Sequence, residues 1–337
     1  MRVTPEKWKG VALSVGLFAT TAAGCAHQQP TAQAAAENPR PGASGHRAHE
    51  EWQGSYPSLD SQKAFRVVNV IAPPKGFLGN IAYDTQRGRL WLISMGKPTN
   101  PDGSKLYEID PKTGAVLRTA DLPFAGDLAS PVFVDGYLYE GVYHQSKMYK
   151  VSVGDVEPFG AIVREVNLPT LTDLKLTDEV HPMPFIEFGG VAQAPGDKLV
   201  FHADDVGELI TIDRETGKLV QRVRTLKALG GIATVVSGDN YYVLGNSDPR
   251  GAYCALSYPP AVSRSPDQKD ISWALINGNT GSVLASIRRQ NSPAYAATVS
   301  LMKHEEVAGT PYGRFTFLAT GEQGILTLEW TPSKDAY

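Results

Sequence analysis

Side chains that can hold a cation or carry a proton recur at similar places along this 337-residue chain. Asn80, Asp127 and Glu187 each come shortly before or at the start of a segment with strand-like alternation. Amide and carboxylate oxygens of this kind suit a hard divalent cation such as calcium, which prefers six to eight oxygen ligands. A second group follows other strand-like segments and comprises His144, His202, Asp204, Asp205, Asn246 and Asp248. Both groups are candidates for lining a ligand site.

The segment His202-Ala-Asp-Asp205 allows two interpretations. An imidazole beside two carboxylates can ligate a transition metal. The same residues are typical of a turn that meets water. The same alternative applies to the polar residues of the first group, because loops between strands are polar wherever they face solvent.

No catalytic constellation is recognisable. The chain has no G-x-S-x-G, H-E-x-x-H, P-loop or dinucleotide fingerprint. Cys254 has no histidine near it in sequence, so it lacks a nucleophile signature. The formal net charge is −3 and no basic patch is present, which argues against nucleic acid as a partner.

A repeated sequence motif predicts the strands that would position these residues. Strand, tight turn and strand recur over 105–121, 208–224 and, more loosely, 273–288. Each turn ends Thr-Gly, and Gly114, Gly217 and Gly281 fall where a hairpin requires a positive φ. The residue before each turn, Asp110, Asp213 or Asn277, can accept hydrogen bonds from the turn amides.

Two further strands precede each phrase, which predicts an all-β domain made of four-stranded meanders around a ring, a β-propeller. We count five blades. A sixth would have to lie within 247–271. The fifth unit, ending in 324–330, is one strand short, and 65–72 is expected to pair with it and close the ring. Strand alternation then predicts that either Val67 and Ile71, or Val68 and Val70, face the neighbouring blade.

Insertions are expected at 170–188, 247–271 and 303–312. The first two open on the same face as the candidate site residues, and the third opens on the other face. The face with two insertions is the expected surface for an unknown protein or small-molecule ligand. Asn80, Asp127 and Glu187 are expected to converge near the propeller axis, where they are the candidate calcium ligands.

The Ile-Asp-x-x-Thr-Gly phrase resembles the repeats of YVTN, NHL and gluconolactonase-like propellers over about 64–334. That resemblance implies the fold, and the gluconolactonase-like enzymes imply a ring of Glu, Asn and Asp around calcium. The segments 76–83 and 126–133 look like the leading strands of the five-bladed glutaminyl cyclotransferases. The glutamate that this resemblance implies in 126–133 is absent, with Asp127 nearby.

The N-terminus has the features of a secretory signal: positive residues, then an apolar stretch shorter than the roughly 20 residues of a membrane-spanning helix. Ala22-Ala23-Gly24-Cys25 resembles the bacterial lipobox. This implies cleavage of 1–24 and lipidation of Cys25, including an acyl chain such as palmitate. Ala26, in place of aspartate, implies the outer membrane of the cell envelope. Ordinary signal cleavage without lipidation is the alternative.

Residues 25–63 are rich in Pro, Ala and polar residues and predict a disordered tether before a propeller at 64–337. A flexible coil of that length spans roughly 35 Å. The leading interpretation is therefore a membrane-anchored binding or scaffold module without catalysis. The alternative is an enzyme, either a calcium-dependent lactonase-like hydrolase or a glutaminyl-cyclotransferase-like enzyme.

Overall fold

Twenty strands in five antiparallel sheets make up the part of the chain that the computed structural model describes. That part covers 65–72, 79–94, 104–124, 130–142, 145–175, 188–203, 207–226, 229–237, 240–247, 271–288, 298–321 and 324–333. The predicted signal, lipidation site and tether lie outside these residues. Among the described residues, no helix is long and apolar enough to cross a membrane.

Each sheet is one blade with four strands in sequence order, except the last. Blade I contains β2 (Gly79–Asp84), β3 (Arg89–Ser94), β4 (Ser104–Ile109) and β5 (Val116–Leu122). Blade II contains β6 (Val132–Val134), β7 (Tyr137–Val142), β8 (Lys147–Ser152) and β9 (Ile162–Asn167). Blade III contains β10 (Phe188–Ala194), β11 (Lys198–Ala203), β12 (Glu208–Asp213) and β13 (Leu219–Arg224). Blade IV contains β14 (Leu229–Ser237), β15 (Asn240–Ser247), β16 (Ile271–Asn277) and β17 (Val283–Arg288).

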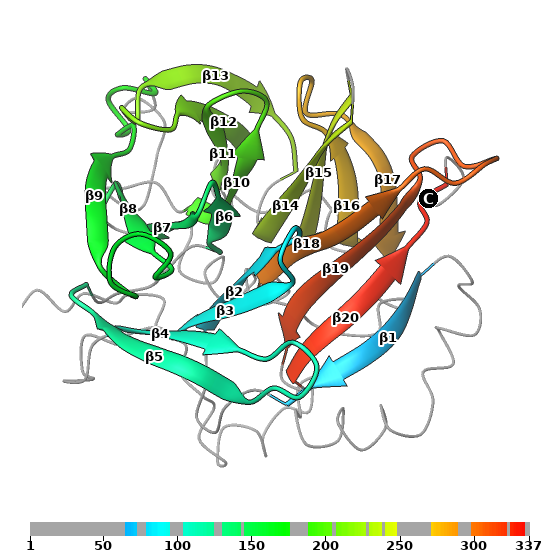
Figure 1. The fold of residues 1–337 in the computed structure, drawn as a ribbon. Coiled ribbons are helices and arrows are strands. Elements are labelled where there is room, and N and C mark those ends of the chain that lie inside the picture. Colours follow the sequence, from blue (N-terminus) through cyan, green and yellow to red (C-terminus); the bar gives the residue numbers. More distant parts are fainter. Residues whose placement is uncertain are drawn as a thin grey trace, which may run out of the picture.

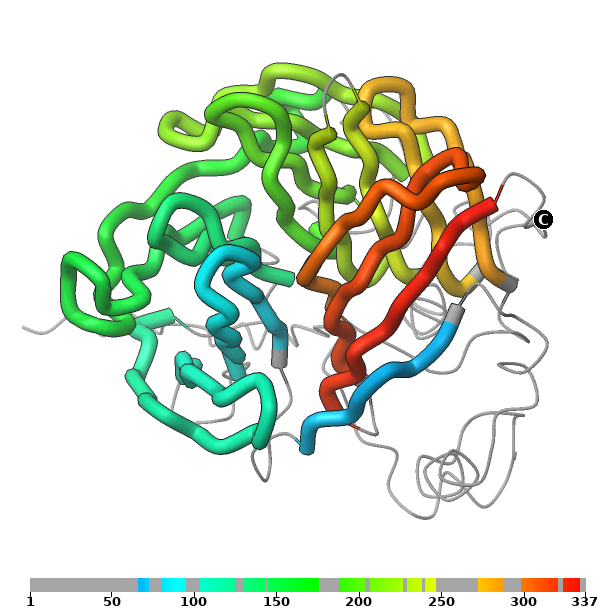
Figure 2. Tube along the Cα trace, turned by 45° about the vertical axis from the view of Figure 1, so that its right-hand side comes forward, coloured from blue at the N-terminus to red at the C-terminus, as the bar shows by residue number. Residues whose placement is uncertain are grey.

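Blade V joins the two ends of the domain. Its strands are β18 (Thr298–Glu305), β19 (Arg314–Gly321), β20 (Gly324–Trp330) and, outermost, β1 (Phe65–Ile71). β1 pairs antiparallel with β20, from Phe65 opposite Trp330 to Ile71 opposite Ile325, so the predicted closure is confirmed. Figure 2 shows these two segments side by side at opposite ends of the colour scale.

The five blades form a closed ring, which confirms the predicted five-bladed β-propeller. The first strands, β2, β6, β10, β14 and β18, surround the centre, while the fourth strands lie at the rim (Figure 1). One hydrophobic cluster fills each of the five contacts between neighbouring blades. Burial of apolar surface between blades therefore holds the ring together.

The three repeated turns have the predicted glycine conformation and side-chain hydrogen bonds. Gly114, Gly217 and Gly281 have φ of 75°, 71° and 74°. The side chains of Asp110, Asp213 and Asn277 accept hydrogen bonds from turn amides two or three residues further on. These local bonds fix each hairpin without help from the rest of the fold.

Two details differ from the sequence-based expectation. The pairing of β1 shifts between Val67 and Asn69, so Val67 and Val70 pack in the cluster between blades IV and V, whereas Val68 is 48% exposed. The two expected pairs were wrong because a β-bulge interrupts simple alternation. The expected insertion at 303–312 is also shorter, because β18 continues to Glu305.

Candidate functional site

Polar side chains are buried around the ring near the end of the second strands. We call them the polar layer: Asn80, Ser130, Glu140, His202, Asn246, Thr298 and Thr320, each less than 10% exposed. They come from all five blades. Buried polar groups cost free energy unless they are hydrogen-bonded, so a layer of them within an apolar ring calls for an explanation.

Glu140 occupies a position that is apolar in every other blade. Pairing with the third strands aligns it with Leu92, Phe201, Gly245 and Ala319. Its side chain is completely buried on the same face of β7 as Leu138 and Val142, which belong to the cluster between blades I and II. A carboxyl group therefore replaces a core side chain at this contact.

Asn80 approaches Glu140 from blade I. Its strand, β2, packs beside β6, and Asn80 shares the face of Ala82, which contacts blade II. Burial raises the pKa of the Glu140 carboxyl well above its ordinary value, and the nearby Asn80 side chain lowers it by less. Neither carboxyl oxygen of Glu140 has a hydrogen-bond partner at normal distance within the part of the chain that the structure describes. Among the described residues, no charged side chain contributes to this shift. The neutral acid is therefore the favoured form.

Three of the remaining members have hydrogen bonds within or near their own blades. His202 Nε2 donates to the carbonyl oxygen of Leu226 at 2.7 Å, since a carbonyl can only accept. Thr298 and Thr320 share a hydrogen bond of 2.8 Å between their Oγ1 atoms. Asn246 is buried opposite Trp273.

The first strands meet closely on one side of the layer. Ser130 and Gly190 form a parallel bridge between blades II and III, and Val191 N–H donates to Ser130 O at 2.8 Å. A Cβ on Gly190 would lie 2.9 Å from Ile232 N. Glycine is therefore required for three blades to pack together here.

The candidate residues from the sequence are placed as follows. Asn80, His202 and Asn246 lie within strands rather than in loops, and all three are buried. His202 is therefore not part of a solvated turn, as one interpretation held. The others lie outside the described residues: Cys25, Asp127, His144, Glu187, Asp204, Asp205, Asp248 and Cys254. Among the described residues, no group of three His, Cys, Asp or Glu side chains is arranged to hold a metal.

Sequence reasoning missed Glu140. Glu140 lies in one of the predicted four-stranded units, but it was not singled out as a candidate site residue. The sequence did contain a signal for it. When the second strands are aligned through the repeated motif of the third strands, Glu140 is the one acidic residue at a position where the other four blades have an apolar residue. Comparing repeats position by position would have found it.

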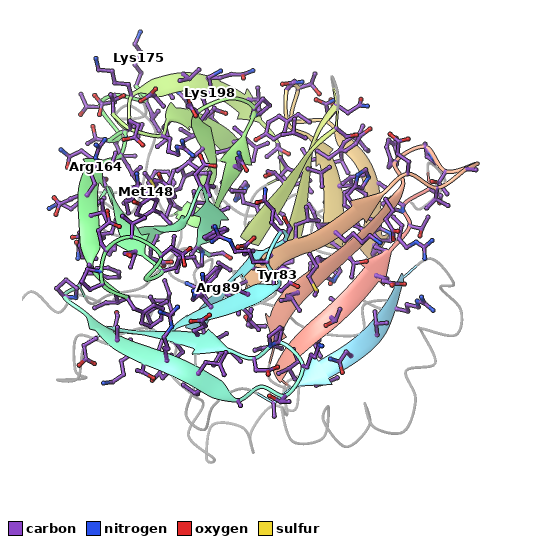
Figure 3. All side chains as sticks on the ribbon, in the orientation of Figure 1. Tyr83, Arg89, Met148, Arg164, Lys175 and Lys198 are labelled. Atoms are coloured by element: carbon purple, nitrogen blue, oxygen red, sulfur yellow. The ribbon has the colours of Figure 1, made fainter. Side chains whose placement is uncertain are left out.

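The cations between blades I and II are engaged at the other end of the strands. Arg89 and Arg118 both donate to the Glu108 carboxylate, at 2.8 and 2.5 Å, and both reach the carbonyl of Val153. Arg89 also pairs with Asp155. Figure 3 labels Arg89, and also Arg164 on the rim strand β9. This network ties the two blades together remote from Glu140.

Comparisons with solved structures return other β-propellers. A glutaminyl cyclase of Myxococcus xanthus is 12% identical with a TM-score of 0.48, over 78% of this chain and 95% of that one. BamB from Moraxella catarrhalis is 15% identical with a TM-score of 0.33, over 77% and 61%. A streptogramin B lyase is 12% identical with a TM-score of 0.38, over 74% and 64%.

This chain spans less than two thirds of the matched BamB and lyase chains. No protein-family model matches its sequence, and no curated protein does. The names of the three propellers denote different functions, so the class defined here is the fold: a five-bladed β-propeller.

Proposed function

We propose that this protein is a binding module of the cell envelope that takes a ligand at the polar layer. The observation that carries the proposal is Glu140, an acid without an ion pair among the described residues, buried against Asn80 at an otherwise apolar position. A buried acid with no structural partner costs stability, and such groups cluster at functional sites. The loops 170–188 and 247–271, expected on the same face, would add to the contact surface.

A thermal-shift screen tests this function. Sugars, amino acids, nucleosides and short peptides are screened against the wild type, Asn80→Ala and Asn240→Ala. Asn240 is exposed at the other end of β15, so its substitution is a matched control. A ligand of the layer raises the melting temperature of the wild type and of Asn240→Ala but not of Asn80→Ala. Equal shifts in all three proteins, for every active compound, would overturn the proposal.

Acid–base catalysis is the second candidate function. The observation that favours it is the buried Glu140 carboxyl, whose raised pKa keeps it protonated to a higher pH than an ordinary glutamate. Glu140 lies on the strand that follows 126–133, the segment that resembles a glutaminyl cyclotransferase. Cyclisation of an N-terminal glutamine joins its α-amino nitrogen to the side-chain carbonyl carbon and releases ammonia, so a proton must pass between two nitrogens.

Assays of purified protein separate the two candidates. If the wild type releases ammonia from glutaminyl dipeptides and Glu140→Gln does not, the result supports the glutaminyl-cyclotransferase-like enzyme. A chelator-sensitive hydrolysis of lactones would support the calcium-dependent alternative, with Asn80, Asp127 and Glu187 as ligands. If the protein shows neither activity but binds a ligand at the polar layer, the result supports the binding module.

We also propose that lipidation of Cys25 anchors the domain in the membrane, in the outer membrane by the identity of Ala26. The support is the lipobox-like sequence after an apolar signal. Cys25→Ser should abolish labelling by a palmitate analogue and release the domain into the soluble fraction. Unchanged labelling in that variant would refute the anchor.

A further inference from the structure

Glu140 is the acid of the polar layer, and the described residues supply it with no cation. Asn80 lies beside it, and the other buried members of the layer carry amide, imidazole and hydroxyl groups: Asn246, His202, Ser130, Thr298 and Thr320. Among the described residues, no ion pair reaches Glu140. Within the described part of the chain, a complementary charge is therefore missing.

Within the described ranges, the cations of blades I and II named here are already paired. Arg89 and Arg118 pair with Glu108 at the other end of the contact between blades I and II. On the third strands, beside the ends of the second strands, Lys105 lies 2.6 Å from Asp121 and Lys147 lies 2.5 Å from Glu165. Moving either lysine to Glu140 would break an existing pair.

Glu140 and Asn80 both lie close to an end of their strands. Glu140 precedes the last residue of β7 by two positions, and Asn80 is the second residue of β2. A strand rises about 3.3 Å per residue, so both lie within about 7 Å of the same end of the ring. A ligand that enters from this end therefore meets the pair early.

We propose that the ligand carries a primary ammonium group, which forms an ion pair with Glu140 and a hydrogen bond with the amide oxygen of Asn80. This inference names the ligand class and rests on the proposed binding function. When an ammonium ion binds, the neutral acid releases its proton to solvent. When the free amine binds, the proton passes from the carboxyl to the nitrogen. Either route ends with carboxylate and ammonium.

An ammonium group fits the available atoms better than calcium does. It has three N–H donors and no acceptor, and it needs one carboxylate and one or two neutral oxygens. Calcium needs six to eight oxygens, and the described part of the layer offers one carboxylate. A phosphate or carboxylate ligand would be repelled by an ionised Glu140 and would therefore leave its carboxyl group protonated.

The test uses the mature protein with three probes at constant ionic strength. n-Propylammonium is the probe, 1-propanol is its uncharged counterpart, and tetramethylammonium is a cation without N–H donors. Infrared spectroscopy follows the band of a protonated carboxyl group, and thermal unfolding follows binding. Glu140→Gln removes the acid, and Glu306→Gln is the control with the same change of charge at an exposed site.

We expect n-propylammonium to remove the carboxyl band and raise the melting temperature of the wild type and of Glu306→Gln. Its affinity should fall about thirtyfold or more in Glu140→Gln, because a buried charge partner is lost. Persistence of the carboxyl band in the wild type, or equal effects of 1-propanol, would overturn the ammonium assignment. The wild-type spectrum decides this even if Glu140→Gln fails to fold. If a neutral compound from the first screen binds through Asn80 instead, the binding function survives and the ligand class is wrong.

Discussion

Gly281, in the turn between β16 and β17, lies directly against the carbonyl oxygen of Arg224 at the end of β13. A Cβ on Gly281 would come within 1.8 Å of that oxygen. The same contact recurs between Gly114 and Ala72 O, and between Gly217 and Asn167 O. Each turn glycine therefore touches the last strand of the preceding blade, and the repeated phrase encodes contact between blades as well as the hairpin.

Gly281→Ala is expected to destabilise the domain more than Gly196→Ala. Both glycines have φ of 74°, so both substitutions carry the same backbone strain, but nothing lies within 4 Å of a Cβ at Gly196. The additional clash at Gly281 should cost about 1–3 kcal/mol, typical of overpacking. Chemical denaturation of the two variants measures the difference, and equal losses of stability would show that the contact with Arg224 is unimportant.

Deletion of 26–72 is expected to give an unfolded or aggregating protein, whereas deletion of 26–60 should leave the melting temperature nearly unchanged. The longer deletion removes β1 and exposes the edge of β20, where each buried hydrogen bond left unmade costs about 1–3 kcal/mol. Total domain stability is only about 5–15 kcal/mol. Identical melting of the two proteins would contradict closure of the ring by β1.

Glu140→Gln is expected to become more stable than the wild type as the pH rises. The folded-state pKa of Glu140 lies above its ordinary value of 4.5. Its contribution to stability is thus complete below the unfolded-state pKa and is lost as the pH rises through the folded-state pKa. Between the two pKa values the wild type should lose up to about 1.4 kcal/mol per pH unit relative to the variant, and above the folded-state pKa the difference should level off. Parallel pH profiles would show that Glu140 ionises normally.

Glu108→Ala should destabilise the domain by about 2–3 kcal/mol, because it strands two arginines that share one carboxylate with a side chain 10% exposed. The control is Glu165→Ala, which breaks the exposed pair with Lys147 and should cost less than about 1 kcal/mol. Urea denaturation of both variants compares the two pairs. Similar losses would mean that the network between blades I and II adds no stability.

The hairpins were predictable because their information is local. Turn glycines and capping side chains fix Lys198–Ala203 and Gly324–Trp330 to the residue, since alternation is uninterrupted there. Bulges were not predictable. The pairing of β18 shifts between Leu301 and Lys303, and the strand runs three residues past its expected end. A bulge depends on the partner strand, which a single alternating pattern does not contain.

The sequence predicted where the candidate site lies, but not all of the residues that form it. Asn80, His202 and Asn246 were singled out as polar residues near strand ends, where the structure has them. Their burial could not be foreseen, because it depends on the neighbouring blade. Glu140 was missed for the same reason: within β7 it looks like one polar residue of an alternating strand, and its apolar surroundings come from blade I.

Closure of the ring by β1 also determines where the chain enters the domain. β1 begins at Phe65 beside Trp330, at the end of blade V away from Thr320 and the polar layer. If Cys25 carries a lipid, as proposed, the anchored chain would join the propeller at the end opposite Glu140. The point of attachment and the proposed ligand site would then lie at opposite ends of the ring, so the junction itself would leave the polar layer uncovered.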